Sequence, residues 1–389
     1  MRLAYVNADP GVPVWGSKGA SIHVQEVLRA LVSRGLEVTL LATNCDGARP
    51  AEVDSIGLVP LPSLPKSAGV ERERAALAAN DSLRAELERL DCDTVYERHS
   101  LWSFAAMEFA RDRGLPGVLE VNAPLVEEQA KHRGLHDRAA AEHAAQRAFA
   151  AASAIIAVSD ELATWLETQP GARGKVHAVP NGINPARFPA NLQPSSPAPR
   201  GTFTIGFVGT LKPWHGLPVL VEAFTQFARD RKNVRLLIVG DGPERGAMEA
   251  SLAAHGLLNS AHFTGLVTPN AVPGFIASMD VAVAPYPPMV NFYFSPLKVY
   301  EYMAAARAVV ASRIGQLEKL IEHERTGLLV PPGDAAALAG AFARLANDAA
   351  LRQSLGDNAR AFVLREHTWD SVAEKILALL NAKTAAVNV

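Results

Sequence analysis

A lysine and a glutamate that follow a Ser-Pro pair form the segment with the clearest capacity for chemistry. Ser295 and Pro296 mark a helix start, because serine caps helices and proline favours the first helical position. The free amides and positive dipole end of such a helix attract anions. Lys298 and Glu301 share one helix face, so a diphosphate followed by a ribose would meet the ammonium and then the carboxylate. An ordinary surface ion pair has the same spacing, and the residues alone leave both interpretations open.

Two other phosphate-binding patterns are nearly present, and neither is complete. The stretch from Gly11 to Lys18 has the glycine spacing of a P-loop but ends Gly-Ser-Lys, where lysine must follow the glycine directly. Gly240, Gly242 and Gly246 resemble a dinucleotide fingerprint, but the third glycine is one residue late. The next expected strand also ends without an acidic residue for a ribose. These departures argue against a P-loop enzyme and a dehydrogenase.

Asp91 and Asp93 form an Asp-x-Asp pair of the kind that holds a divalent metal in some transferases. They precede their expected strand, which places them at the end opposite the ligand side of a parallel sheet. We therefore expect a capping or solvated role for these carboxylates and no metal site.

Short β-branched runs alternate with longer helical patterns along the chain, which is typical of parallel βαβ units. The expected strands are 3–6, 38–42, 94–96, 118–121, 155–158, 176–179, 204–208, 234–239, 262–264, 281–284, 308–311 and 328–330. The expected helices are 20–33, 71–90, 102–113, 126–150, 217–229, 244–254, 296–306, 335–347, 351–365 and 369–380.

A stretch rich in Pro and Ser divides this series in two. We expect a first domain over residues 1–190, an interdomain linker over 191–202, and a second domain over 203–366. The predicted fold class is α/β, with two tandem doubly wound Rossmann-like domains that face a cleft.

Length and composition exclude several classes of protein. The 389 residues are enough for two or three domains, and 38 Lys and Arg against 40 Asp and Glu give a net charge of −2. Such a balance provides no global attraction to nucleic acid or anionic lipid. Two cysteines form no metal or disulfide framework, and we find no signal peptide or transmembrane segment. We expect a cytoplasmic protein without a nucleic-acid partner.

Several motifs in order along the chain resemble family 4 of the glycosyltransferases, which are retaining enzymes with the GT-B fold. The Ser295–Ala306 segment is similar to the family's donor-binding helix, and other landmarks precede and follow it. These are Arg2-Leu-Ala-Tyr-Val, Gly19-Ala-Ser-Ile-His-Val, Val158-Ser159, Val179-Pro-Asn-Gly-Ile-Asn184, Phe207-Val-Gly-Thr-Leu-Lys-Pro-Trp-His-Gly216, Ile238-Val-Gly-Asp-Gly-Pro243, Phe263-Thr-Gly-Leu-Val267 and Gly327-Leu-Leu-Val-Pro331. The resemblance also implies that residues 367–389 form a helix that crosses back to the first domain.

The resemblance implies a nucleotide diphosphate sugar as donor, bound mainly by the second domain. The base would lie near Gly265–Val267, the ribose on Glu301, and the diphosphate on the amides of Leu297 and Lys298. The full expected donor set is Gly19, Thr210, Lys212, His215, Gly265, Leu266, Val267, Ser295, Pro296, Leu297, Lys298 and Glu301.

Three departures from the family pattern affect this donor site. The glycine pair of the first loop is Lys18-Gly19, so only Gly19 can let the backbone approach the phosphates closely. Tyr293 stands where the family usually has the first of two glutamates, so a role for that glutamate does not carry over. Thr210 and His215 stand where the family often has arginine and lysine. Positive charge in that loop must then come from Lys212 or from a protonated His215, or be absent.

The first domain is expected to bind the acceptor. Polar residues after two expected strands should face the cleft, and the resulting set is Lys18, Arg98, His99 and Asn122. Many relatives place a histidine at the position of Asn122, and an asparagine there can still hydrogen-bond a sugar hydroxyl. The acceptor would be a hydroxyl of a sugar, a lipid-linked molecule or a small molecule, and peripheral membrane contact is compatible with the second of these.

The resulting hypothesis is a retaining, metal-independent glycosyltransferase with no cofactor beyond its nucleotide-sugar co-substrate. Lys298, Glu301, His99 and Asn122 are its candidate catalytic residues. Two alternatives remain open, namely a nucleotide-sugar epimerase of the same fold and a catalytically inactive nucleotide-sugar-binding protein.

Overall fold

The computed structural model describes residues 1–65 and 69–382, which divide into two compact units. The first unit comprises residues 1–181, 293–295 and the C-terminal segment from residue 369, and the second comprises 182–292 and 296–368. Both units are α/β, as the alternation of strand and helix patterns predicted.

The first unit is built on a parallel sheet with the strand order β3-β2-β1-β4-β5-β6-β7. Its strands are β1 (Arg2–Asn7), β2 (Glu37–Ala42), β3 (Gly57–Pro60), β4 (Thr94–Arg98), β5 (Gly117–Val121), β6 (Ala154–Ala157) and β7 (Val176–Ala178). Its helices are α1 (Gly19–Ser33), α2 (Val70–Arg89), α3 (Ala105–Asp112), α4 (Leu125–His132), α5 (Arg138–Ala151), α6 (Asp160–Leu166) and α14 (Trp369–Ala382).

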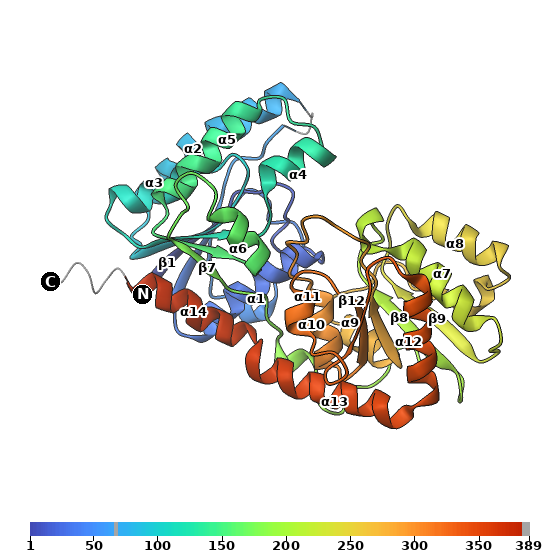
Figure 1. Cartoon of the computed structure of the whole chain (residues 1–389). Helices are drawn as coiled ribbons and strands as arrows, with labels where there is room; N and C mark the ends of the chain where they lie inside the picture. The colour runs from blue at the N-terminus through green and yellow to red at the C-terminus, as the bar shows by residue number, and fades with distance from the viewer. Residues whose placement is uncertain (66–68, 383–389) are drawn as a thin grey trace. The chain divides into compact units, whose positions relative to one another are not determined.

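Helices cover both faces of this sheet, so its central strands are buried on both sides. Helices α2, α3 and α5 pack on one face, and α1 and α14 lie on the other (Figure 1). Every residue of β5 is buried, including the charged Glu120. A carboxylate in an otherwise apolar strand requires polar partners, and those partners belong to the site described below.

The second unit repeats this plan with the strand order β10-β9-β8-β11-β12-β13, again all parallel. Its strands are β8 (Phe203–Val208), β9 (Val234–Val239), β10 (Ala261–Phe263), β11 (Val281–Ala284), β12 (Ala308–Ser312) and β13 (Leu328–Val330). Its helices are α7 (Leu217–Ala228), α8 (Arg245–Ala254), α9 (Val272–Ala277), α10 (Leu297–Ala304), α11 (Leu317–Leu320), α12 (Ala335–Asn347) and α13 (Ala349–Glu366). Helices α7, α8 and α12 pack on one face of the sheet, and α9 and α10 lie on the other (Figure 1).

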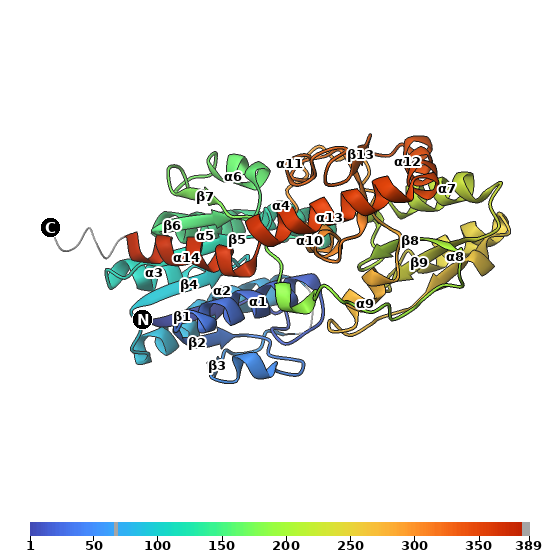
Figure 2. The same ribbon diagram turned by 90° about the horizontal axis from the view of Figure 1, so that it is seen from below.

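The C-terminal helix α14 belongs to the first unit, although the second unit precedes it in the sequence. It lies beside α1 (Figure 2). Trp369 packs edge-on against His23 of α1, with 5.0 Å between ring centroids, and Arg34 lies 2.6 Å from the carboxylate of Glu374. Residues 383–389, which were included in the predicted C-terminal helix, lie outside the described residues.

Some sequence predictions differ from the structure for local reasons. The helix predicted over 126–150 is two helices, α4 and α5, because Gly134 between them has a φ of +80° that ends helical geometry. The short elements β3, α6, α9 and α11 were not predicted, since segments of four to seven residues carry little periodicity.

The stretch predicted as an interdomain linker, 191–202, belongs to the second unit. The Ser195 amide donates to the carbonyl of Gly274 at 2.9 Å, and the Ser196 amide donates to Ser278 Oγ at 2.9 Å. Arg235 also donates to the carbonyl of Ser196 at 2.8 Å. These backbone contacts have no composition signature, which explains why a Pro/Ser-rich stretch was assigned to a linker.

A substitution at Gly240, which directly follows β9, tests how tightly the loops of the second unit are packed. The φ of Gly240 is +130°, and a Cβ there would lie 2.2 Å from the carbonyl oxygen of Gly209. We expect Gly240→Ala to lower the free energy of unfolding by about 2–4 kcal/mol in chemical denaturation. Gly246 is the matched control, because it lies in α8 with open space around its Cα. Gly246→Ala should be neutral or stabilising by up to about 1 kcal/mol, and equal effects of the two substitutions would contradict the packing argument.

Candidate functional site

Three loops at the carboxyl ends of neighbouring strands β8, β9 and β10 are hydrogen-bonded to one another in the second unit. The Gly209 amide donates to Val239 at 2.9 Å, and the Gly240 amide donates to Gly265 at 3.1 Å. A Cβ on Gly242 would lie 2.5 Å from the carbonyl oxygen of Leu211. Two of the three glycines that resemble a dinucleotide fingerprint, Gly240 and Gly242, therefore permit close packing of the loop backbones.

Lys298, in the first turn of α10, places a buried cation beside these loops. Its backbone and stem are partly exposed, but Nζ is buried and has no hydrogen-bond partner in the described part of the chain. The ammonium lies 4.1 Å from the ring centroid of Phe207 and 5.7 Å from that of Tyr286. A Cβ on Gly209 would be 3.0 Å from Nζ, so the glycine leaves room for the ammonium.

The environment of Lys298 disfavours its charged form. Burial lowers the pKa of Lys298 from its ordinary 10.5 to about 7, although the carboxylate of Glu301 acts in the opposite direction. The rings of Phe207 and Tyr286 attract the cation but accept no strong hydrogen bond. A buried ammonium held only by ring faces has the properties of an anion site.

The start of α10 differs from the expectation in one respect. Its N-cap is Pro296 and not Ser295, and within the described residues no side chain caps the first turn. Ser295 Oγ instead accepts the amide of Asn181 at 3.2 Å, and Asn181 Nδ2 donates to the carbonyl of Ser295 at 2.8 Å. The prediction that Ser295 caps the helix is therefore wrong. The amides of Leu297 and Lys298 still lie in the first turn, at the positive end of the helix dipole.

Glu301 lies one turn after Lys298 and forms an ion pair that sequence reasoning missed. Arg187 Nη1 is 3.1 Å from Glu301 Oε1, and Arg187 Nη2 donates to the carbonyl of Pro269 at 2.8 Å. Both side chains are more than four-fifths buried. Because 114 residues separate Arg187 from Glu301, no local pattern could have indicated this pair. The arginine fixes the direction of the carboxylate.

In the loop after Gly209, the environment of His215 disfavours its protonated form. His215 Nδ1 lies 2.7 Å from the carbonyl oxygen of Thr210, and its ring packs between Phe207 and Tyr286. Burial, and then the charge of Lys298, lower the pKa of His215 to about 3. This lowered pKa favours a neutral His215 near pH 7 in the absence of a bound anion. Lys212, whose Nζ lies over the Trp214 ring at 5.6 Å, remains as the cation of this loop.

The segment expected to contact a base, Gly265–Val267, lies at the outer end of the same row of loops. Gly265 has a φ of +68° and accepts the amide of Gly240, and Leu266 is 83% exposed. The structure thus brings together the loop residues predicted from the second domain, from Gly265 through Thr210 and His215 to Lys298. An exposed leucine beside a polar loop is suited to stacking against a planar ligand.

In the first unit, Asn122, one of the residues predicted for the acceptor, contacts the buried Glu120. Tyr96 Oη and Asn122 Nδ2 donate to the two oxygens of this carboxylate, and His23 Nε2 lies 2.7 Å from Oε1. Burial raises the pKa of Glu120, but the charges of His23 and Arg98 and these hydrogen bonds outweigh it and lower the pKa to about 2. Glu120 is therefore ionised and fixes the orientation of Asn122 and His23. Sequence reasoning singled out neither Glu120 nor His23.

The remaining candidates of the first unit differ in burial. His99 is buried against the ring of Phe149, and its Nδ1 has no partner among the residues described. Burial and the charge of Arg98 lower the pKa of His99 to about 4, so the ring is neutral near pH 7. Lys18 and Gly19 are exposed at the N-terminal end of α1, where Lys18 occupies the N-cap position.

Asp91 and Asp93 both pair with Arg2, so their spacing serves an ion-pair cluster. Arg2 Nη2 lies 2.7 Å from Asp93, and Nη1 contacts Asp91. Hydrogen bonds from Arg2 lower the pKa of Asp93 to about 2. Across residues 1–65 and 69–382, no three His, Cys, Asp or Glu side chains form a group able to hold a metal ion. The expectation of metal-independent turnover stays a prediction.

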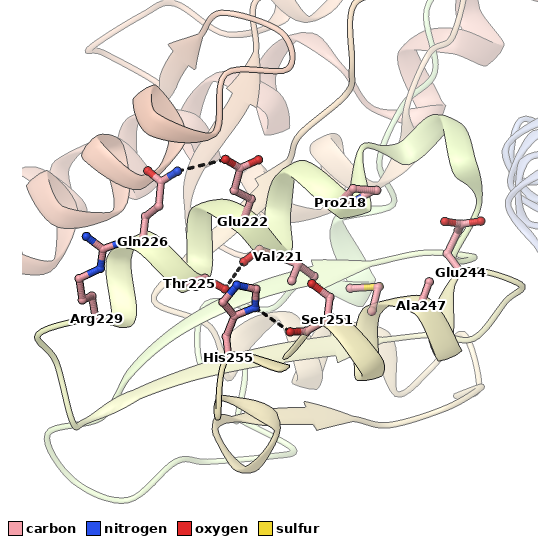
Figure 3. Close-up of a pocket in the computed structure, with 11 residues that line it drawn as sticks. Pro218, Val221, Glu222, Thr225, Gln226, Arg229, Glu244, Ala247, Ser251 and His255 are labelled. Carbon is pink, nitrogen blue, oxygen red and sulfur yellow. Dashed lines mark hydrogen bonds between the residues drawn. The ribbon is translucent and has the colours of Figure 1, made fainter. Parts of the chain in front are cut away.

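A groove of about 570 Å³ lies between α7 and α8 in the second unit, away from the predicted residues (Figure 3). Polar groups that line it pair along their own helices. Thr225 Oγ1 donates to the carbonyl of Val221 at 2.9 Å, and His255 Nδ1 lies 2.8 Å from that of Ser251. The groove lies away from the predicted donor and acceptor residues, and we assign it no role.

The fold is similar to that of known glycosyltransferases. Sucrose-phosphate synthase from Thermosynechococcus elongatus superposes with a TM-score of 0.78 at 22% identity, over 99% of this chain and 100% of that one. Anabaena HepE, solved in complex with UDP and glucose, gives 0.73 at 17% identity, over 98% and 100%. Two Rossmann-like units with such neighbours define a GT-B protein.

Family models then identify the group within this fold. The model described as Glycosyltransferase Family 4 matches residues 17–187, and the one described as Glycosyl transferases group 1 matches residues 202–348. The chain belongs to family 4 of the glycosyltransferases. An uncharacterized glycosyltransferase of Methanocaldococcus jannaschii is 30% identical over 211 residues, which is 52% of this chain and 52% of that protein. The chain thus spans about half the length of this relative.

Among the described residues, every helix is too short or too polar to cross a membrane.

The lowered pKa of Lys298 predicts a specific pH dependence of stability. The folded protein releases this proton near pH 7, whereas the unfolded chain holds it up to about pH 10.5. Between these values the unfolded state binds more protons, so stability rises with pH, by up to about 1.4 kcal/mol per pH unit. In urea denaturation from pH 7 to 10, the difference in unfolding free energy between the wild type and Lys298→Met should show this slope. The exposed Lys232→Met is the control, and a flat difference for Lys298→Met would refute the assignment.

Proposed function

We propose that this protein transfers a sugar from a nucleotide diphosphate sugar to a hydroxyl acceptor, with retention of the anomeric configuration and without a cofactor. The observation that carries the proposal is the buried, unpartnered ammonium of Lys298 at the start of α10. A buried cation without an acceptor costs free energy, and an anionic ligand would offset that cost. A diphosphate has the charge and the oxygen atoms that this position needs.

The proposed donor lies along the row of loops in the second unit. Its diphosphate would accept hydrogen bonds from Lys298 and from the amides of Leu297 and Lys298. Its ribose hydroxyls would donate to Glu301, whose carboxylate is held in place by Arg187. The base would contact Gly265–Val267, where Leu266 is exposed. HepE, which shares the fold, was solved with UDP, and this supports a nucleotide diphosphate as the ligand class.

The proposed reaction uses positive charge where negative charge develops. The bond between the anomeric carbon and the phosphate oxygen breaks, and its electron pair stays on the departing diphosphate. The acceptor oxygen bonds to the same face of the anomeric carbon, and the acceptor proton passes to the departing phosphate oxygen. Lys298 and the amides of α10 stabilise the charge on that diphosphate, which is largest in the transition state. This route needs no enzymic nucleophile, and no divalent metal is part of the proposal.

His99 and Asn122 are proposed to bind neutral sugar hydroxyls in the first unit. His99 is neutral near pH 7 because of burial and Arg98, so it can exchange a hydrogen bond but does not supply a charge. Asn122 is oriented by Glu120, which receives one hydrogen from its amide. These roles require hydrogen-bonding capacity and no proton transfer.

The experiment that tests the function is a panel of UDP-, GDP- and ADP-sugars incubated with the protein and with simple sugar or polyol acceptors. Released nucleotide together with a new glycoside whose NMR anomeric configuration matches that of the donor is the expected result. An epimerised donor without transfer would indicate the epimerase, and binding without turnover would indicate an inactive binding protein. Activity should survive EDTA, and a loss that Mg²⁺ or Mn²⁺ restores would contradict metal independence.

Lys298 and Glu301 should contribute differently to turnover. Glu301→Gln removes charge-assisted hydrogen bonds worth about 1.5–3 kcal/mol, which corresponds to about tenfold to a hundredfold in donor affinity, with a smaller change in kcat. Lys298→Ala should lower kcat more than it weakens donor binding, because the charge it meets grows in the transition state. Calorimetry with the donor and steady-state kinetics measure the two quantities. Equal changes in donor affinity and in kcat for the two variants would contradict the separate roles of Lys298 in turnover and Glu301 in donor binding.

A further inference from the structure

Arg98, the last residue of β4, carries a guanidinium that makes no ion pair or hydrogen bond with the residues described. Arg98 is only 8% exposed. Its Nε is buried and makes no hydrogen bond in the described part of the chain. None of the ion pairs or hydrogen bonds between described residues involves its side chain. A guanidinium has five N–H donors and is always charged, so this arrangement is costly unless a ligand completes it.

The acidic neighbours of Arg98 are already engaged. Arg98 pairs in register with Glu120 of β5, but the oxygens of that carboxylate contact Tyr96, Asn122 and His23. Glu97 precedes Arg98 and so points to the opposite face of the sheet, where Ser103 donates to it. Neither carboxylate lies within ion-pair distance of Arg98. The fold thus surrounds the guanidinium with acids that are oriented toward other groups.

Two further polar atoms on the same face are also unsatisfied. Tyr5 and Tyr96 are paired across β1 and β4, with stacked rings 5.2 Å apart, and Asn7 follows on the same face of β1 as Tyr5. Tyr5 Oη and Asn7 Oδ1 are buried without partners in the described residues. Arg98 lies on the same face of the sheet, because it follows Tyr96 by two residues in β4. A hydroxyl, an amide oxygen and a guanidinium are complementary to a ligand that carries both hydroxyls and an oxyanion.

We propose that Arg98 binds an anionic oxygen group, a phosphate ester or a carboxylate, on the acceptor, beside a hydroxyl-bearing ring that contacts Tyr5 and Asn7. This inference rests on the proposed function, because it specifies the acceptor of that reaction. The donor diphosphate already has Lys298 and α10 in the second unit, whereas Arg98 stands at the ligand end of the other sheet. A neutral or cationic acceptor would leave the guanidinium unpaired.

The first test compares acceptors that differ only in the anionic group. Glucose, glucose 6-phosphate and glucuronate form one set, and myo-inositol and inositol 1-phosphate form another, each with the donor identified by the panel above. We expect kcat/KM to be about tenfold to a hundredfold higher for an anionic member than for its neutral counterpart. Comparison of glucose 6-phosphate with glucuronate shows whether the anionic group preferred is a phosphate ester or a carboxylate. Arg98→Gln should abolish this preference, Arg98→Lys should restore part of it, and the exposed Arg111→Gln should retain it. Equal use of neutral and anionic acceptors, or a preference that survives Arg98→Gln, overturns the proposal.

The second test needs no turnover, so its failure is separate from failure of the proposed function. Glucose 6-phosphate should raise the midpoint of thermal unfolding in a Lys298→Met background, where the donor cation is absent, and glucose should not. Adding Arg98→Met should remove this response. Arg98→Met alone should remain folded, because Tyr96, Asn122 and His23 still contact the Glu120 carboxylate. A response that persists without Arg98, or a marked loss of stability in Arg98→Met, would show a structural arginine and overturn the proposal.

Discussion

Burying a charge without a partner is the constraint on which the functional features of both units depend. In the second unit, Lys298 lies against the rings of Phe207 and Tyr286, and its ammonium has no hydrogen-bond acceptor within the described residues. Folding alone would select against such a group, since a methionine of similar length would pack there at lower cost. Its presence is explained when an anion binds beside it. The proposed diphosphate meets this requirement with the same atoms that would stabilise it as a leaving group.

Close packing of backbone makes this arrangement possible. The loops after β8, β9 and β10 approach one another so closely that side chains at Gly209, Gly240 or Gly242 would collide with backbone or with the ammonium. Glycine therefore serves two purposes here, because it lets the loops pack and it leaves space for Lys298.

The first unit uses an ionised carboxylate in a comparable way. Glu120 lies in a strand that is buried throughout, and it is stabilised by Tyr96, Asn122 and His23 from three different elements. With those contacts its oxygens are occupied, and Asn122 is held in one orientation. A family position that often holds histidine can thus hold asparagine here and still present a fixed hydrogen-bonding group.

Much of the fold was predictable from the sequence, because parallel βαβ units leave strong periodic patterns. The long helices and buried strands were found within a few residues, whereas β3 and the helix break at Gly134 were missed because their patterns are short. Lys298 and Glu301 were predicted as donor residues from their spacing after a Ser-Pro pair together with the family resemblance, and the spacing is local information.

The sequence by itself determined the class of fold, the family, and the residues that stand at strand and helix ends. Tertiary structure alone decided the electrostatic state of those residues. Arg187 reaches Glu301 from 114 positions away, His215 loses its proton because it is buried beside Lys298, and Ser295 contacts Asn181 instead of capping α10. Periodicity and motifs report neighbours along the chain. Desolvation and long-range hydrogen bonds depend on neighbours in space, which is the physical reason why only the folded chain sets them.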